Sequence, residues 1–309
     1  MNKNSQQDQH ASTITVLETY PQEWYTLLDS GDGRKLEQVG PYTLIRPEAE
    51  AIWQPAYNPA KWNAAHAEFV VTNEKNGGHW EKYKKIPEEW QVECSGLQLR
   101  MEIGNSKQIG IFPEQIAHWD WMKSRIHTSR RPMRVLNLFG YTGVASLAAA
   151  QAGAKVTHLD ASKKAVGWGM ENQKRSHLDQ SSIRWLVDDA IKFVQREARR
   201  DSRYEGILLD PPKFGRGPKG EVWEFYKLIP NLLQSCKAIL ALEPDFIILT
   251  AYAVKASSIT LQNAMDELMQ GYRGTTTAGE LTIVEKSVGR RLPTSIFVRW
   301  QADNTGGKA

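Results

Sequence analysis

Short apolar runs alternate with stretches of helical periodicity through the second half of the chain. Five runs rich in Val, Ile and Leu have the length of buried strands, and they cover residues 134–139, 155–159, 183–187, 205–209 and 245–249. Helical patterns separate them over residues 163–176, 191–200 and 224–242. This alternation predicts an α/β fold in which helices cover both faces of a parallel sheet.

The last two strand patterns are connected differently. Residues 281–285 and 295–300 have no helical stretch between them, and the segment 287–293 that joins them is short and contains Gly and Pro. A short connection suits antiparallel neighbours. We therefore expect an antiparallel pair at the end of an otherwise parallel sheet.

The first part of the chain has another character. Strand patterns over residues 42–46, 68–72 and 97–102 are separated by Pro, Gly and Asn, and seven of the eleven tryptophans lie before residue 124. We expect a small β-rich domain over residues 14–123, with its tryptophans in the core rather than stacked on bases. Residues 124–302 then form the second domain, and the polar ends 1–13 and 303–309 are predicted to be disordered.

Composition narrows the class of protein. A chain of 309 residues with 41% hydrophobic residues can build a large core. No apolar run of about eighteen residues occurs and no signal-peptide pattern opens the chain, so we expect a soluble, cytoplasmic protein without a membrane partner. Cys94 and Cys236 lack metal-ligand spacing, so we expect buried reduced thiols and no metal site.

The net charge of +4 is mildly basic, which is compatible with a polyanionic partner and with an ordinary soluble enzyme. Part of the positive charge gathers before the first predicted core strand, in Arg125, Arg130, Arg131 and Arg134. Such a cluster suits phosphate contacts, and it equally suits a solvated surface.

A glycine turn follows the first predicted core strand, where a helix should begin. It reads Gly140-Tyr141-Thr142-Gly143, and the second strand ends in Asp160. Nicotinamide enzymes use Gly-x-Gly-x-x-Gly at this place because the backbone must approach a pyrophosphate, whereas Tyr141 and Thr142 fill that space here. A phosphate-free nucleoside such as S-adenosylmethionine fits better, and Asp160 can accept both ribose hydroxyls. The alternative is a structural turn, which any doubly wound protein requires.

A second polar segment, Asp210-Pro211-Pro212-Lys213-Phe214, follows the fourth predicted core strand. The prolines fix the backbone and remove N–H donors, which leaves the Asp210 carboxylate and the Pro211 carbonyl as acceptors for an amino or ring nitrogen. Phe214 can stack on the ring that carries this nitrogen, and Lys213 can orient a base or a phosphate. A plain turn and a solvated lysine are the alternatives. Residues 215–220 are predicted to form a flexible basic loop.

Together these motifs resemble the class I S-adenosylmethionine-dependent methyltransferases. More narrowly, residues 136–143, Asp160 with its neighbours, Asp189-Ala190 and residues 210–214 resemble the bacterial 23S ribosomal RNA large-subunit methyltransferase family. The resemblance implies a Rossmann-like seven-stranded sheet of order 3-2-1-4-5-7-6 whose last strand is antiparallel. Residues 46–53 resemble a less characterised branch of these methyltransferases.

The resemblance also implies a set of cofactor contacts. The turn would receive the methionyl part, Asp160 the ribose, and Asp189 or Asp188 the adenine amino group, although each acid can instead be a helix cap. Residues 108–115 resemble a segment that helps to enclose the cofactor. The candidate cofactor-binding residues are Phe112, Gln115, Asn137, Phe139, Gly140, Tyr141, Thr142, Gly143, Asp160, Ala161, Ser162, Asn172, Asp188, Asp189 and Ala190.

Family members that methylate cytosine C5 use a cysteine after the fifth strand to form a covalent adduct. The corresponding residues 249–254 contain no cysteine. We therefore expect direct in-line methyl transfer to a nitrogen of RNA, with ribosomal RNA as the expected substrate and Asp210, Pro211, Lys213 and Phe214 as the acceptor-side residues. A methyltransferase acting on protein or a small molecule and a non-catalytic RNA-binding relative are the alternatives, and the oligomeric state is open.

Overall fold

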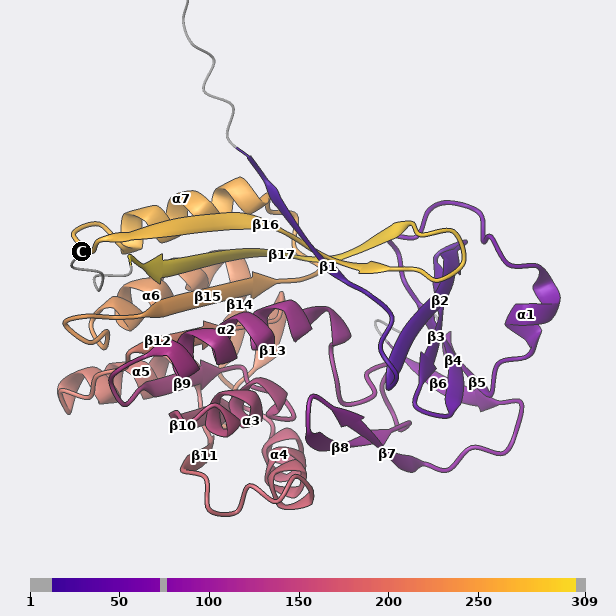
Figure 1. Cartoon of the computed structure of the whole chain (residues 1–309), viewed down its shortest axis with the longest axis horizontal. Coiled ribbons are helices and arrows are strands. Elements are labelled where there is room, and N and C mark those ends of the chain that lie inside the picture. Colours follow the sequence, from indigo (N-terminus) through magenta and orange to yellow (C-terminus); the bar gives the residue numbers. More distant parts are fainter. Residues whose placement is uncertain (1–12, 73–76, 304–309) are drawn as a thin grey trace, which may run out of the picture.

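A mixed eight-stranded sheet forms the larger lobe of the computed structural model, which describes residues 13–72 and 77–303 (Figure 1). The predicted disordered ends lie almost entirely outside these residues. In spatial order the strands are β1 (Thr15–Thr19), β16 (Gly274–Val284), β17 (Arg291–Ala302), β15 (Phe246–Ala251), β12 (Gly206–Leu209), β9 (Arg134–Leu138), β10 (Lys155–Asp160) and β11 (Ile183–Val187).

This order confirms the predicted sheet. Counted from the other edge, β11 to β16 follow the sequence 3-2-1-4-5-7-6. The strands β9, β10, β11, β12 and β15 are parallel, and β17 runs antiparallel to both β15 and β16. Both β16 and β17 are longer than the predicted segments, so the connection between them is shorter.

The strand β1 was not predicted and extends the sheet beyond β16, to which it is parallel. Thr15 pairs with Gly279 in this register, and a Cβ atom on Gly279 would lie 1.6 Å from the Thr15 carbonyl oxygen. Glycine at position 279 is therefore what lets the backbone of β1 approach β16.

Helices cover both faces of the sheet, as predicted. They are α2 (Ile116–Thr128), α3 (Val144–Gln151), α4 (Lys163–Arg175), α5 (Ala190–Arg199), α6 (Phe225–Lys237) and α7 (Ser258–Leu268). Buried residues of α2 and α3 belong to one hydrophobic core, and those of α5, α6 and α7 belong to the core on the opposite face. No helix within residues 13–72 and 77–303 is long and apolar enough to cross a membrane.

The smaller lobe is β-rich, in agreement with the prediction. Five strands form one sheet in the order β2 (Tyr25–Gly31), β3 (Arg34–Val39), β4 (Tyr42–Pro47), β5 (Ala67–Val71) and β6 (Gly78–Lys82). A separate hairpin consists of β7 (Glu89–Cys94) and β8 (Leu97–Glu102). The short helix α1 (Pro59–Asn63) and the 3₁₀ turn η1 (Pro113–Gln115) complete the elements before α2.

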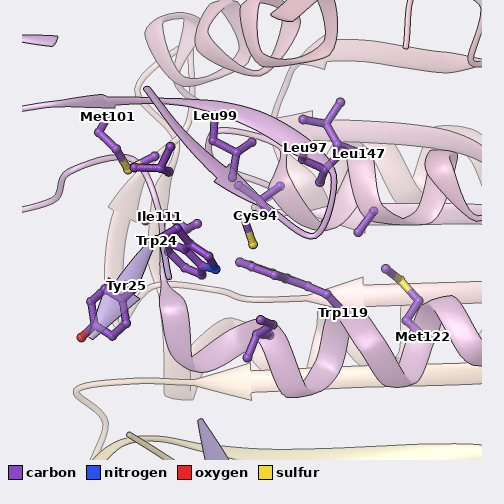
Figure 2. Packing of buried hydrophobic residues seen from close by; sticks show 14 of the residues in the cluster. Trp24, Tyr25, Cys94, Leu97, Leu99, Met101, Ile111, Trp119, Met122 and Leu147 are labelled. Atoms are coloured by element: carbon purple, nitrogen blue, oxygen red, sulfur yellow. The ribbon is translucent and has the colours of Figure 1, made fainter. Parts of the chain in front are cut away.

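One hydrophobic core continues from the smaller lobe into the sheet lobe. Trp24 and Cys94 of the smaller lobe lie close to Trp119 of α2, and Leu97 of β8 lies close to Leu147 of α3 (Figure 2). The tryptophans therefore build the core, as predicted. Since β1 and α2 precede residue 124 but pack on the large sheet, the division at that residue stays a prediction.

The hairpin end between β16 and β17 also reaches the smaller lobe (Figure 1). The Lys286 amide donates to the Leu27 carbonyl at 2.8 Å, and the Ser287 amide donates to the Leu28 carbonyl at 3.1 Å. Arg290 pairs with Glu285 and Asp29, at 2.5 Å and 3.5 Å. The two lobes are thus joined by hydrogen bonds as well as by a common core.

Candidate cofactor and acceptor site

The carboxyl ends of β9, β10, β11 and β12 meet at one edge of the sheet, which is the usual place for ligands in open α/β folds. A cavity of about 310 Å³ lies there. The predicted residues that line it are Phe112, Phe139, Tyr141, Asp160, Ala161, Ser162, Asp188, Asp189, Ala190 and Asp210. The fold thus brings together acids that are up to 50 positions apart in the sequence.

The turn after β9 has a strained backbone. Phe139 and Tyr141 adopt φ values of 59° and 50°, in the left-handed region that side chains other than glycine rarely occupy. Gly143 has φ 82°, and a Cβ atom there would lie 2.6 Å from the Trp185 ring. Backbone strain of this kind clusters at active and ligand sites, where the surrounding structure holds it in place.

Asp160 is fixed at the tip of β10 by two backbone donors. Its Oδ2 accepts from the Tyr141 amide at 2.9 Å, and its Oδ1 accepts from the Ser162 amide at 2.8 Å. Burial raises the pKa of this carboxyl, although these amides oppose the shift. Each oxygen keeps a second lone pair, so the carboxylate can still accept hydroxyl groups from a ligand.

Two of the candidate residues are helix caps as well as cavity residues. Ser162 Oγ accepts from the Ala165 amide at 3.2 Å and caps α4, and Asp189 Oδ1 accepts from the Lys192 amide at 2.9 Å and caps α5. The neighbouring Asp188 forms an ion pair with Arg196. The cap interpretation is therefore correct for Asp189, and a ligand has to share its carboxylate with the helix.

A second, inner cavity of about 70 Å³ lies behind the turn. Gln115, Asn137, Gly140 and Thr142 line it, together with Asp210. Asn137 Nδ2 donates to Ser146 Oγ at 2.9 Å, and Thr142 Oγ1 donates to the Gly110 carbonyl at 2.6 Å. These side chains hold the turn in place.

Two of the cofactor-binding candidates line neither cavity. Asn172 is fully buried; its Nδ2 donates to the Thr142 carbonyl at 3.2 Å, and its Oδ1 accepts from the Arg100 amide at 2.9 Å. Gly143 lies at the start of α3 against Trp185. Asn172 thus supports the turn from behind, and Gly143 ends the turn in close contact with Trp185.

Asp210 lies at the end of β12 and lines both cavities. Gln115 Nε2 donates to its Oδ2 at 3.4 Å, and its Oδ1 is buried with no hydrogen-bond partner in the described part of the chain. Burial, reinforced by the nearby Glu114, raises the pKa of Asp210 to about 8. A carboxyl group with this pKa can exchange a proton near neutral pH.

The residues after Asp210 do not all face the cavity. Pro212 lines it and accepts a hydrogen bond from Trp223 Nε1 at 2.6 Å, whereas Pro211, Lys213 and Phe214 lie outside its lining. Phe214 is 64% exposed, and the Lys213 Nζ lies 5.6 Å from the centre of its ring. The two side chains form an outer surface beside the cavity.

The segment 215–220, which was predicted as a flexible loop, begins in β13 (Phe214–Arg216) and otherwise forms the turn that leads to β14 (Val222–Glu224), so β13 and β14 make a hairpin. Trp223 anchors this hairpin, because its ring is buried and lies 4.9 Å from the ring of Phe139. Gly215, Arg216 and Gly217 consequently line the cavity.

Sequence reasoning missed several cavity residues, of which Tyr252 is the most informative. It follows β15, in the segment where related enzymes carry their cysteine, and its ring lies 6.0 Å from that of Phe112. Its position after a core strand was a usable signal. Cys94 and Cys236 are buried away from both cavities, and burial raises the pKa of each thiol to about 12.

A family model described as S-adenosylmethionine-dependent methyltransferase matches residues 51–268. The chain belongs to this family. A solved S-adenosylmethionine-dependent methyltransferase from Agrobacterium tumefaciens has the same fold, with a TM-score of 0.91 and 45% identity over 94% of this chain and 95% of that one. The predicted family, enzyme class and cofactor are thereby confirmed.

Curated relatives match a shorter part of this methyltransferase. Ribosomal RNA large subunit methyltransferase I of Aeromonas salmonicida is 30% identical over 124 residues, which cover 40% of this chain and 30% of the relative. Ribosomal RNA large subunit methyltransferase K/L of Pseudoalteromonas translucida is 30% identical over 129 residues, or 41% of this chain and 17% of that one. The chain thus spans a third or less of these two relatives.

The residues at the cavity fit S-adenosylmethionine. A volume of about 310 Å³ suits a small-molecule site, and the Asp160 carboxylate suits a ribose. The helix α3 begins at the turn, and no side chain of the described residues caps its first amides. These amides and the helix dipole favour the carboxylate of a methionyl group.

Proposed function

We propose that this methyltransferase transfers the methyl group of S-adenosylmethionine directly to a nitrogen atom of RNA, with ribosomal RNA as the substrate class. The observation that carries the proposal is Asp210. Its Oδ1 has no hydrogen-bond partner among the described residues, it lines both cavities, and its pKa of about 8 supports a role as proton acceptor in its ionised form.

The bound cofactor supplies an activated methyl group, and its sulfur keeps the electron pair of the broken bond. Asp210 and the Pro211 carbonyl accept the N–H groups of the acceptor and align its lone pair with the methyl carbon. Once the new bond forms, the nitrogen carries an extra proton, which Asp210 receives in its ionised form, the minor form below its pKa of about 8. The proposal assigns cofactor binding to Asp160, Asp189 and the turn at 140–143.

Direct transfer is favoured over a covalent route because neither cysteine of the chain reaches the site. A C5 mechanism requires a thiolate beside the acceptor ring. Both thiols are instead buried in the cores with raised pKa values, and Tyr252 occupies the place after β15. A nitrogen acceptor has a lone pair already or gains one when it loses a proton, so it needs no such activation.

The surface next to the cavity supports an RNA acceptor. Phe214 is exposed beside Lys213, and Arg216 lines the cavity on the same hairpin. An exposed ring flanked by cations suits base stacking and phosphate contact. The curated relatives named above also act, by their names, on ribosomal RNA.

The arginines around the start of β9 contribute less than their clustering in the sequence indicates. Arg125, Arg131 and Arg134 form ion pairs with Asp245, Glu243 and Glu205. Their charges are largely compensated, so the structure favours the β13–β14 hairpin over this cluster as the RNA contact.

The test is methyl transfer from tritiated S-adenosylmethionine into total RNA and total protein of a strain that lacks the gene. We expect label in the large ribosomal RNA and none with the Asp210→Asn variant, and nucleoside mass spectrometry should identify an N-methylated base. Label in protein alone would support the second acceptor class. Binding of RNA without transfer to any fraction would refute the enzymatic proposal.

A further inference from the structure

A buried histidine shares the inner cavity with Asp210. His118 lies on α2, is 2% exposed and lines this cavity, and neither ring nitrogen has a hydrogen-bond partner in the described part of the chain. Its ring packs edge-on against Phe297, with 4.9 Å between the ring centres. Burying two polar atoms without partners is unfavourable by several kcal/mol, roughly, so such an arrangement calls for an explanation.

The residue that precedes α2 directs a second polar side chain to the same cavity. Gln115 and His118 are three positions apart, which places them on one face of the helix start. Gln115 already donates to Oδ2 of Asp210, whereas Oδ1 of Asp210 has no donor within residues 13–72 and 77–303. One cavity therefore holds an acceptor that lacks a donor and a ring that can supply one.

The cavity has room for bridging water. Its volume of about 70 Å³ exceeds the roughly 10–15 Å³ that one water molecule needs by this measure. Asp210, Gln115, His118 and Asn137 supply polar atoms around it. A water bridge between a carboxylate and a neutral imidazole is thus sterically and chemically feasible.

We propose that His118 is a positioning residue that orients the Asp210 carboxylate and supplies hydrogen bonds to its Oδ1 through water in the inner cavity. This inference rests on the proposed role of Asp210 in methyl transfer. The imidazole suits this role because its neutral form has one donor and one acceptor nitrogen, so it can fix the direction of a water chain.

Neighbouring charges are consistent with this role. Burial and the adjacent Arg299 of β17 lower the pKa of His118 to about 3, so its ring is neutral at physiological pH. Glu114 and Tyr252 face Asp210 from η1 and from the end of β15. Burial and the Glu114 charge raise the pKa of Asp210, because both disfavour its ionised form. Hydrogen bonds from the cavity would favour the ionised form and lower this pKa.

The first test compares His118→Phe with His118→Gln. Phenylalanine keeps the ring packing but has no polar atoms, whereas glutamine keeps a donor and an acceptor. We expect His118→Phe to lower kcat at pH 7 by about tenfold, with recovery at higher pH and an unchanged affinity for S-adenosylmethionine, and His118→Gln to restore most of the rate. Met122→Leu, which changes an apolar side chain in the same cavity, should leave the pH profile unshifted.

The second test does not depend on activity. Carbon NMR of selectively labelled aspartate, with Asp210→Asn for assignment, measures the titration of Asp210 directly. A higher pKa of Asp210 in His118→Phe than in the wild type supports the inference even if no RNA is methylated. Absence of RNA methylation would refute only the proposed function. An unchanged Asp210 titration in folded His118→Phe overturns the inference. If that variant does not fold, nitrogen NMR of the His118 ring in the wild type and in Asp210→Asn replaces this test. Identical ring signals in the two proteins would also overturn the inference.

Discussion

Replacing Asp210 by asparagine should abolish methyl transfer and at the same time stabilise the protein at alkaline pH. Asparagine keeps the size of the side chain and an acceptor oxygen, but it cannot take up the proton that the methylated nitrogen releases. We expect the rate to fall by roughly 100-fold or more, which is the usual contribution of a positioned proton acceptor.

The stability effect follows from the pKa of Asp210, which folding raises from 3.8 to about 8. The unfolded chain loses this proton near pH 4 and the folded chain near pH 8. The native state therefore loses stability as the pH rises between these values, and asparagine escapes the loss. The difference between the two pKa values limits this loss of stability to about 6 kcal/mol at most. Asp210 borders a cavity that admits water, and water weakens the penalty for the buried charge. We therefore expect Asp210→Asn to be more stable than the wild type by about 2 kcal/mol at alkaline pH.

Thermal unfolding of the two proteins at pH 4.5 and pH 8.5 measures this effect. We expect nearly equal melting temperatures at the acid pH and a gain of roughly 4 °C for Asp210→Asn at the alkaline pH. Asp266→Asn, an exposed acid of α7, is the matched control and should change neither value. Wild-type methyl transfer by Asp210→Asn would refute the proposed role of the carboxyl group. Absence of stabilisation at pH 8.5 would refute its raised pKa.

Three further predictions concern the turn, the cofactor and the outer surface. Asp160→Ala should weaken S-adenosylmethionine binding by at least about tenfold in isothermal titration, since it removes the proposed ribose acceptor and also leaves the Tyr141 amide without its partner. Gly143→Ala should lower the free energy of unfolding by roughly 2–4 kcal/mol in urea titrations, because its Cβ would meet Trp185 at 2.6 Å and φ is 82°; an unchanged midpoint would contradict the close packing. Phe214→Ala should leave cofactor affinity and melting temperature unchanged and raise KM for RNA by about fivefold or more, as expected for the loss of a stacking ring; equal KM values would exclude Phe214 from substrate binding.

The central sheet could be predicted from the sequence because buried parallel strands leave a strong local signal. The apolar runs at β9 and β12 contain the whole of each strand, since both faces of these two strands are covered. The edge strand β1 has no comparable run, and its place depends on Gly279, some 260 residues later. The polar start of β16, which contains three threonines in succession, hid the true length of that strand.

Motifs located the acids of the site, but they could not show which atoms face the ligand. Asp160 and Asp210 are carried to the cavity by the ends of their strands, which a strand pattern predicts directly. Asn172 lies on α4, and whether it faces the cavity or the back of the turn depends on how α4 packs on β8. Trp223 enters the site through the packing of the β13–β14 hairpin, which no local pattern records.

The chemistry of Asp210 depends on an element that the strand motifs do not include. The motif supplies a carboxyl group at the end of β12, but α2 and η1 supply Gln115, Glu114 and His118 around it. Burial and the like charge of Glu114 raise the pKa of this acid, and the proposed water bridge from His118 would oppose that rise. A relative with the same Asp-Pro-Pro segment but another α2 would therefore have a different pKa at this position and a different pH dependence of methyl transfer.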